Sequence, residues 1–344
     1  MLGVGLRAKH FPYLAKHKAN VDFFEVLSEN YIDTEGYPRE VVRRLRRDYK
    51  MCMHGVSLSM GSATGVNNAY LKKLKQLADE IEPFLISDHL CFTGVKRENS
   101  HDLLPLPFTM RMVDIVVRNI DTVQNFLKTR IALENVSSYL TWRASEMSEW
   151  DFINTIVQKS GCKILLDINN VYVNAKNHGY NADDFLTRIN PTHVGEIHIA
   201  GYSDMGTHLF DTHAEPVHAP VLELWKKHAA RFHKIPMIVE RDDAIPAFHV
   251  VEREVLRLGK IRENAYIKER KNRIVMEVFL PPRVPEKRNN ADVGKLQKVF
   301  LEGIQNQNFA SLAQVKGGGK LSDKAALKVY HAGWYIHTGR SFIF

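Results

Sequence analysis

The chain has 344 residues, of which 44% are hydrophobic and 25% charged, as in soluble globular proteins that form one large barrel with an appendage or two ordinary domains. No apolar run is long enough to cross a bilayer and the N-terminal segment carries no export signal, so we expect a cytoplasmic protein without a membrane partner. The net charge of +8 comes from residues 259–344, with 16 Lys/Arg and 7 Asp/Glu; the 31 Lys/Arg and 32 Asp/Glu before them give no basic bias, which argues against nucleic acid as a partner.

Strand and helix patterns alternate from the N-terminus onward. Apolar strands of the kind found in parallel sheets are predicted at residues 3–6, 23–27, 51–56, 84–89 and 131–135. Helices with apolar residues at i, i+3 and i+4 are predicted between them, at residues 39–49, 69–82, 109–128 and 149–158. This alternation is typical of βα units.

The pattern continues through the stretch KILLDINNVYVNAKNHG, residues 163–179, which begins as a buried strand and then breaks into a cluster of polar residues. Beyond it we predict a helix at 182–189, a strand at 194–199, a loop at 201–218, a helix at 220–233, a strand at 236–242 and a helix at 245–271. About eight strands and their helices over ~260 residues have the length and rhythm of a (β/α)8 TIM-type barrel, an α/β fold. A doubly wound open sheet is the alternative, although no glycine-rich dinucleotide fingerprint supports it.

The three cysteines, Cys52, Cys91 and Cys162, lie far apart and form no CxxC pair. Their spacing argues against a disulfide framework and against a thiolate zinc site, and it suits a reducing cytoplasm. Each lies in an apolar, strand-like segment, so we expect all three to be buried and unreactive.

Polar side chains stand where most of the predicted strands end. Because the carboxyl ends of barrel strands meet at one mouth, residues far apart in the sequence converge there. Any one histidine alone is better explained as a hydrogen-bonded structural residue, but a series of polar strand ends costs free energy unless the groups are paired or ligated. Imidazole and carboxylate are ligands for zinc, iron or manganese, and two or three metals bridged by carboxylates would use the whole set. The candidate ligands are His54, His89, Glu134, Asp167, Asn170, His198, Asp211, His213 and Glu240.

Long motifs follow one another between residue 1 and about residue 260. They are GLR, FFEVLSENY, MHGVSLSMGS, SDHL, ALENVSSYL, SEMSEW, LLDINNVYVNAKNHG, EIHIAGY, DTHAEPV and ERDDAIP. Together they resemble the motifs of multinuclear non-heme iron-dependent oxidative enzymes, a family that includes the methanobactin biosynthesis enzyme. The resemblance implies a TIM-type barrel with two or three irons of mixed Fe(II)/Fe(III) state. It also implies that dioxygen is the co-substrate and that the substrate is a cysteine-containing precursor peptide made on the ribosome.

The resemblance also assigns roles to residues of this chain. It implies one iron held by His54, His89 and Glu134, a second by Glu134, Asp167, His198 and Glu240, and a third, more labile one by Asn170, Asp211 and His213. We expect catalytic roles for Asp167, His198 and Glu240, substrate contacts for Asn135, His178 and Arg241, and supporting contacts for Glu25 and Glu29. The expected reaction is a four-electron-type oxidation of a peptidyl cysteine, with oxazolone–thioamide, thiooxazole or another group as the product.

The end of the chain differs in composition from the rest. We predict a barrel at residues 1–275, a proline- and charge-rich linker at 276–292 and a basic, partly helical extension at 293–344. The segment LSDKAALKVYHAGWYIHTGR resembles the start of the small helical partner protein often encoded beside these enzymes. The extension is therefore either a truncated partner module, fused in the partner's place, or a loosely ordered basic tail; a basic face would suit an acidic leader peptide.

Three other functions use the same residue types. A divalent-metal phosphodiesterase or endonuclease needs such ligands and could hold DNA with the basic tail, although the near-neutral barrel argues against it. A sugar-isomerase-like barrel would act without dioxygen. A metal-binding scaffold would bind the peptide without changing it.

Overall fold

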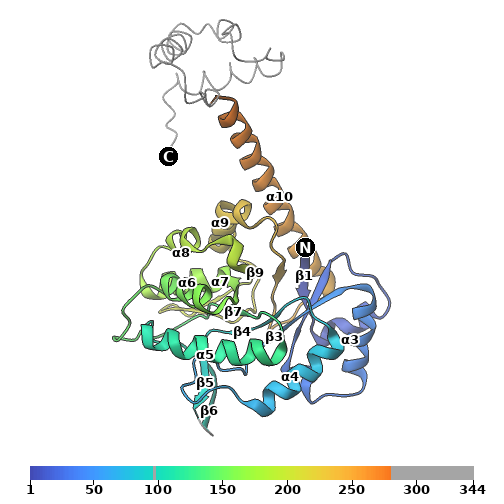
Figure 1. Cartoon of the computed structure of the whole chain (residues 1–344). Helices are drawn as coiled ribbons and strands as arrows, with labels where there is room; N and C mark the ends of the chain where they lie inside the picture. Colours follow the sequence, from blue (N-terminus) through green and yellow to red (C-terminus); the bar gives the residue numbers. More distant parts are fainter. Residues whose placement is uncertain (96–97, 280–344) are drawn as a thin grey trace, which may run out of the picture. The chain divides into compact units, whose positions relative to one another are not determined.

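Eight parallel strands close into a barrel, and the helices form a layer around it (Figure 1). The structure is a computed structural model that describes residues 1–95 and 98–279. The barrel strands are β1 (Leu2–Gly5), β2 (Phe23–Leu27), β3 (Lys50–Gly55), β4 (Ile86–His89), β7 (Ala132–Glu134), β8 (Lys163–Asp167), β9 (Val194–Ile199) and β12 (Met237–Val239). Since β1 pairs with both β2 and β12, the sheet has no edge, which confirms the predicted (β/α)8 barrel and excludes the open sheet.

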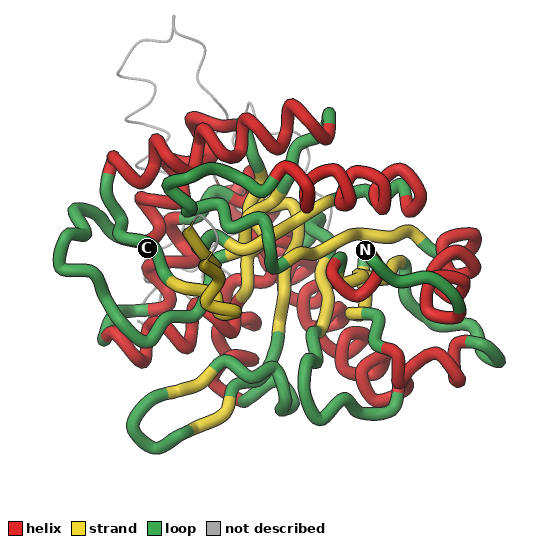
Figure 2. The backbone as a smooth tube through the Cα atoms, turned by 90° about the horizontal axis from the view of Figure 1, so that it is seen from below, coloured by secondary structure: helices red, strands yellow, loops and turns green. Residues whose placement is uncertain are grey.

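Figure 2 shows helices around the strands, and the core contains apolar side chains from both helices and strands. The helices are α1 (Phe11–Leu14), α2 (Glu29–Ile32), α3 (Tyr37–Asp48), α4 (Asn68–Ile81), α5 (Met110–Leu127), α6 (Glu149–Ser160), α7 (Ile168–His178), α8 (Ala182–Arg188), α9 (Ala219–His228) and α10 (Phe248–Phe279), with short 3-10 helices η1 (Ala8–His10), η2 (Pro191–His193) and η3 (Ala229–Phe232). Leu71, Leu74 and Leu77 of α4 show the pattern, since all three are buried in the core that the strands share. Periodic apolar residues thus decide which face of each helix meets the barrel.

Besides the short helices α1, α2, η1 and η2, three regular elements occur where the sequence predicted loops or nothing. Helix α7 follows β8 without a connecting loop, because the Asp167 carboxylate accepts a hydrogen bond from the backbone N–H of Asn170 and caps the helix. Two antiparallel hairpins, β5 (Phe92–Val95) with β6 (Glu98–Leu104) and β10 (Ser203–Asp204) with β11 (Leu209–Phe210), are the other two. Strands of two residues are too short to produce a periodic sequence pattern.

The chain divides into two compact units, Met1–Tyr266 and Ile267–Phe344. Helix α10 begins three residues later than predicted, at Phe248, and continues to Phe279, so residues 276–279 are helical and not part of a linker. The remainder of the predicted linker and the basic extension lie outside the described residues. No helix in the described ranges combines the length and apolarity that crossing a bilayer requires.

Gly201 lies just after β9, where the chain returns against its own backbone. A Cβ at this position would lie 2.4 Å from the carbonyl oxygens of Glu215 and Pro216, and a backbone yields less readily than a side chain. We expect Gly201→Ala to lower the free energy of unfolding by about 1–3 kcal/mol, measured by urea denaturation. An unchanged unfolding midpoint would show that residues 202–216 relax without cost.

Candidate metal centre

A cavity of about 740 Å³ lies at the carboxyl ends of the barrel strands. Seven of the nine predicted ligands line it: His54, His89, Glu134, Asn170, Asp211, His213 and Glu240. The other two, Asp167 and His198, are fully buried and contact the lining residues, Asp167 next to His213 and His198 next to Glu240. The structure therefore brings all nine together.

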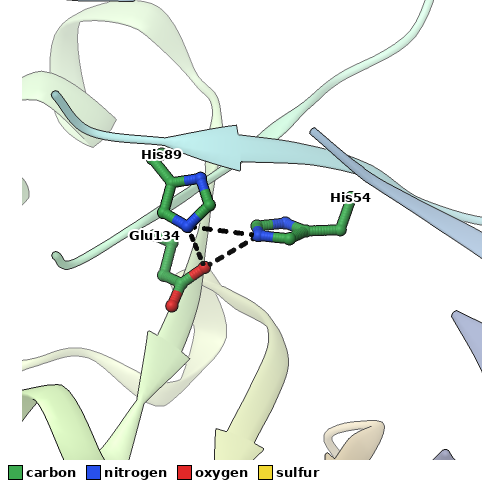
Figure 3. Close-up of side chains that lie close together, drawn as sticks. All are labelled: His54, His89 and Glu134. Carbon is green, nitrogen blue, oxygen red and sulfur yellow. Dashed lines mark hydrogen bonds and ion pairs between the residues drawn. The ribbon is translucent and has the colours of Figure 1, made fainter. Parts of the chain in front are cut away.

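The first group comes from three neighbouring strands, with His54 at the end of β3, His89 at the end of β4 and Glu134 at the end of β7 (Figure 3). Glu134 Oε2 lies 3.1 Å from His54 Nε2 and 3.4 Å from His89 Nε2. The other ring nitrogens are engaged: His89 Nδ1 lies 2.9 Å from the Gly55 carbonyl oxygen and His54 Nδ1 lies 2.8 Å from Ser87 Oγ. These contacts leave both Nε2 atoms directed at one carboxylate oxygen, as in metal sites with oriented imidazoles.

The second half of the centre surrounds Glu240. Its Oε2 lies 2.9 Å from His198 Nδ1 and 3.3 Å from His213 Nδ1. His213 Nε2 lies 2.7 Å from Asp211 Oδ1 and 3.8 Å from Asp167 Oδ2. Asp211 and His213 stand on the loop after β11, so this half joins strand ends to a loop, whereas the first half uses strand ends alone.

Five buried potential ligand atoms of the centre have no aligned hydrogen bond within the described residues, although three of them, Glu134 Oε2, His198 Nδ1 and His213 Nε2, lie 2.7 to 3.1 Å from an ion-pair partner. The five atoms are Glu134 Oε2, Asp167 Oδ2, Asn170 Oδ1, His198 Nδ1 and His213 Nε2. Buried polar atoms cost free energy unless they are paired, and shared cations would satisfy several of them at once. Five buried groups have potential ligand atoms within 4.8 Å of one another, and three of them consist of predicted ligands alone: His54 with His89 and Glu134, Glu134 with Asp167 and His198, and Asp167 with His213 and Glu240. The other two contain Glu25, once with His198 and Glu240 and once with Cys52 and Glu196. Since Glu134 and Asp167 each belong to two groups, the residues fit a carboxylate-bridged multinuclear centre.

Charges in the cluster balance one another in the metal-free chain. Burial raises the pKa of Glu134, but the neighbouring His89 and His54 outweigh burial and lower this pKa to about 2. Burial lowers the pKa of His54, but its hydrogen bond and ion pair with Glu134 raise this pKa to about 9. For Asp167 burial dominates and raises the pKa well above its usual range. A cation bound here would take the place of the protons that the cluster otherwise holds.

Polar residues of α7 hold two segments that we call the mouth loops, residues 136–148 and 201–218. Asn174 donates to the Val136 carbonyl at 2.9 Å and accepts from the Ser138 N–H at 2.8 Å. Asn177 makes two bonds with the backbone of Leu209, at 3.0 and 2.9 Å. The asparagines of the stretch 163–179 therefore differ in role: the predicted ligand Asn170 lines the cavity, whereas Asn174 and Asn177 hold the loops at its entrance.

The three predicted substrate contacts do not line the cavity that the described residues form. Asn135 is buried and pairs with the backbone N–H and carbonyl of Asp167 at 2.9 and 3.0 Å. His178 Nε2 lies 2.7 Å from Ser138 Oγ. Arg241 donates to the Ala214 carbonyl and forms an ion pair with Glu254. In the structure each of them holds a neighbouring segment in place.

Sequence reasoning understated or missed three residues around the centre. The carboxylate of Glu25, on β2, accepts a hydrogen bond from His198 Nε2 at 3.2 Å. Cys52 and Glu196 are also buried in the barrel interior, where Cys52 Sγ lies 3.4 Å from Glu196 Oε1. Arg7 pairs with Glu240 at 3.1 Å and also with Asp242. Glu196 had a usable signal, because it lies two residues before His198 on one strand and therefore faces the same side. The cysteines are free and buried, as predicted.

Comparison with known proteins agrees with the motifs. Residues 1–263 match the model of a family described as RiPP precursor modification enzyme MbnB/TglH/ChrH, where RiPP denotes a ribosomally made, later modified peptide. A UPF0276 protein of Rhizorhabdus wittichii is 44% identical over 248 residues, which cover 72% of this chain and 89% of that protein. A UPF0276 protein of Anaeromyxobacter sp. is 43% identical over 263 residues, covering 76% and 93%.

Among solved structures, an L-ribulose 3-epimerase aligns with a TM-score of 0.50 at 11% identity, over 82% of this chain and 99% of that one. At this identity the similarity shows the barrel fold alone. The family predicted from the motifs is confirmed by the family model, which spans the whole barrel. The chain therefore belongs to the RiPP precursor modification enzyme MbnB/TglH/ChrH family.

Proposed function

We propose that this protein is a multinuclear iron-dependent enzyme that uses dioxygen to oxidise cysteine residues of a ribosomally made precursor peptide. The observation that carries the proposal is the set of three buried ligand groups that share Glu134 and Asp167 at the cavity. Family membership supports a peptide substrate. Imidazole and carboxylate donors suit iron, manganese or zinc, and the motif resemblance to iron-dependent oxidative enzymes favours iron.

Under this proposal the three groups hold separate ions. The first iron would be held by His54, His89 and Glu134. The second would be held by Asp167, His198 and the same Glu134. The third would be held by His213, Asp211 and Glu240 together with Asp167, and Asn170 would add its amide oxygen. A bound Fe(II)/Fe(III) set would supply redox equivalents and the Lewis acidity that lowers the pKa of a thiol. Glu240 Oε2 lies near both His198 Nδ1, at 2.9 Å, and His213 Nδ1, at 3.3 Å. We therefore propose Glu240 as a ligand of the third iron with His213, whereas the resemblance assigned it to the second iron.

The protein's own residues would orient the ligands and exclude water. Ser87 and Gly55 fix the first two imidazoles, and Arg7 offsets the negative charge of Glu240 and Asp242. The expected reaction takes four electrons and four protons from the peptide and reduces one dioxygen to two waters. Asp167, His198 and Glu240 remain the proposed catalytic residues because all three belong to the second half of the centre, where Asp167 and His198 also group with Glu134 of the first half.

The test begins with protein produced in iron-rich medium and purified without oxygen. We expect two or more irons per chain by metal analysis and Mössbauer spectroscopy, reduced in His54→Ala and Asp167→Ala. Zinc or manganese alone would contradict the proposal. Cysteine-rich peptides encoded beside the gene, incubated with dioxygen and reductant, should change in mass; binding without a mass change would favour the scaffold function. We further propose that the enzyme acts in the cytoplasm, with a small helical partner protein or with residues 293–344 in its place.

Glu25 offers a prediction within this proposal. Glu25 is 1% exposed and its carboxylate accepts a hydrogen bond from His198 Nε2, which leaves the lone pair of Nδ1, 2.9 Å from Glu240 Oε2, to ligate a metal. We expect Glu25→Gln to weaken iron affinity about 10- to 100-fold, measured by competition with a chelator, because the imidazole loses its orientation. Glu80→Gln, which removes a carboxylate paired with Arg39 between α3 and α4, is the matched control and should not change the affinity. Equal affinity in Glu25→Gln and wild type would show that Glu240 alone orients His198.

A further inference from the structure

Large apolar side chains gather on the mouth loops and are exposed there. Of the ten that are exposed among the described residues, five belong to these loops: Tyr139 at 47%, Leu140 at 50%, Trp142 at 42%, Met205 at 58% and Phe210 at 41%. Single exposed apolar residues are ordinary, but two of these five, Tyr139 and Phe210, also line the cavity, which indicates a surface for a partner. The remaining question is which partner the surface fits.

Two of these five side chains, both aromatic, form a stacked pair across the loops. The rings of Tyr139 and Phe210 have centroids 5.0 Å apart and lie at 15° to each other, although 70 residues separate them in sequence. Both rings also line the cavity that holds the candidate ligands. His208 meets them edge-on, at 5.7 Å from Tyr139 and 6.3 Å from Phe210. The pair is thus part of the cavity wall and of the outer surface at once.

Hydrogen bonds hold this pair in place. The Tyr139 hydroxyl accepts from the backbone N–H of Asp211 at 3.0 Å. On either side, Asn174 of α7 binds Ser138 and Asn177 binds Leu209, the residues that precede Tyr139 and Phe210. A surface fixed before binding loses little conformational entropy when a ligand arrives. The positions of the Tyr139 and Phe210 rings are therefore fixed by hydrogen bonds of the surrounding loops.

We propose that the Tyr139–Phe210 stack is a docking surface for the precursor peptide, which would place a bulky apolar or aromatic side chain on it next to the modified cysteine. This inference rests on the proposed function, which supplies the peptide. The stack is continuous with the centre, since Tyr139 contacts Asp211 and Asp211 lies 2.7 Å from His213. A residue seated on the rings would place its neighbour, about 3.5 Å further along an extended chain, inside the cavity.

The charged residues of the cavity wall also predict which peptide side chains would bind poorly beside the cysteine. Among the Lys, Arg, Asp and Glu side chains that line the cavity, five carboxylates, including Asp102 and Asp211, outnumber the two cations Arg7 and Lys9, so a carboxylate beside the cysteine would be repelled. Aromatic faces bind apolar and aromatic groups by stacking and by burial of apolar area. The cavity volume of about 740 Å³ lies within the range that ligand sites occupy and exceeds what a single cysteine side chain needs.

The test uses the full chain purified without oxygen and a phage-displayed library in which one cysteine is flanked by randomised residues. We expect selection of Trp, Tyr, Phe, Leu or Met adjacent to the cysteine and depletion of Asp and Glu. A synthetic peptide of the selected sequence should bind Phe210→Ala about tenfold more weakly than wild type. Tyr139→Phe should keep the preference, because it keeps the ring and removes only the hydroxyl. Phe126→Ala is the matched control: Phe126 is 40% exposed on α5, near the end that leads into the start of β7, and its removal should leave binding unchanged.

Two results would overturn the proposal. One is a selection without apolar preference, or the same preference and affinity in Phe210→Ala. The other is a wild-type dimer that Phe210→Ala converts to a monomer in gel filtration, which would assign the patch to a second copy of the chain. Iron content measured on the same samples separates this inference from the proposed function: loss of the peptide preference with iron intact contradicts only the docking surface, whereas iron-free wild type contradicts the iron enzyme.

Discussion

Glu134→Ala is expected to remove most of the iron from the protein, more than the loss of any single histidine. Glu134 is 1% exposed and belongs to two of the three ligand groups, so its carboxylate would serve two ions at once. His89 belongs to the first group alone, and His89→Ala should therefore cost one ion. We expect peptide oxidation by Glu134→Ala to fall by about a thousandfold, which corresponds to ~4 kcal/mol of lost stabilisation.

The measurement is iron per chain by elemental analysis, with Mössbauer spectra of the same samples. His228→Ala is the control, because His228 is also a buried histidine paired with a carboxylate, Asp183 at 2.7 Å, but it stands on α9 away from the cavity. This control should keep its iron whatever it costs in stability. Equal iron in Glu134→Ala and His89→Ala would contradict a carboxylate shared between two ions.

Removal of the metal is expected to lower the melting temperature by on the order of 10 °C. A ligand that binds only the folded chain stabilises it by ~4 kcal/mol at about a thousand times its dissociation constant, and each kcal/mol moves the melting temperature by about 2–4 °C at this size. The metal-free protein must bury Asp167 and its neighbouring carboxylates without their cations, which costs free energy.

Asp167→Asn should make the metal-free protein more stable and the iron-loaded protein less stable, and these opposite changes distinguish a metal ligand from a structural carboxylate. The amide keeps the cap on α7, because asparagine accepts a hydrogen bond from the Asn170 N–H as aspartate does. It also removes a carboxyl group whose burial costs free energy in the metal-free chain, since burial raises the pKa of Asp167 well above its usual range. We therefore expect the metal-free variant to melt above metal-free wild type, and the iron-loaded variant to melt below iron-loaded wild type, by calorimetry under nitrogen. Asp183→Asn, outside the cavity, should shift both states equally. A variant of Asp167 that melts lower in both states would show a structural carboxylate and no ligand.

The barrel was predictable because its signals are local. Apolar strands and helices with 3.6-residue periodicity can be read within short windows, and His54, His89 and Glu134 stand where such strands end. Helix α7 escaped detection since Asp167, Asn169 and Asn170 are typical turn residues, and only the cap made by Asp167 shows why a helix begins there.

Contacts across the barrel could not be predicted. Glu25 meets His198 from a strand on the other side of β1 and β12, and this contact exists only because the sheet closes. The approach of His213 to Glu240 depends on a loop whose course no periodicity encodes. The list of ligands was therefore within reach of the sequence and the family motifs, whereas their division into groups needed the geometry.

Asp167 has a consequence beyond its own group. One of its oxygens caps α7, the other belongs to the candidate centre, and the same helix holds both mouth loops through Asn174 and Asn177. A metal that holds Asp167 under the proposed function would therefore also hold the cap of α7, and through this helix it would stabilise the two mouth loops. A metal-loaded protein would then present a stiffer entrance to the peptide than a metal-free one.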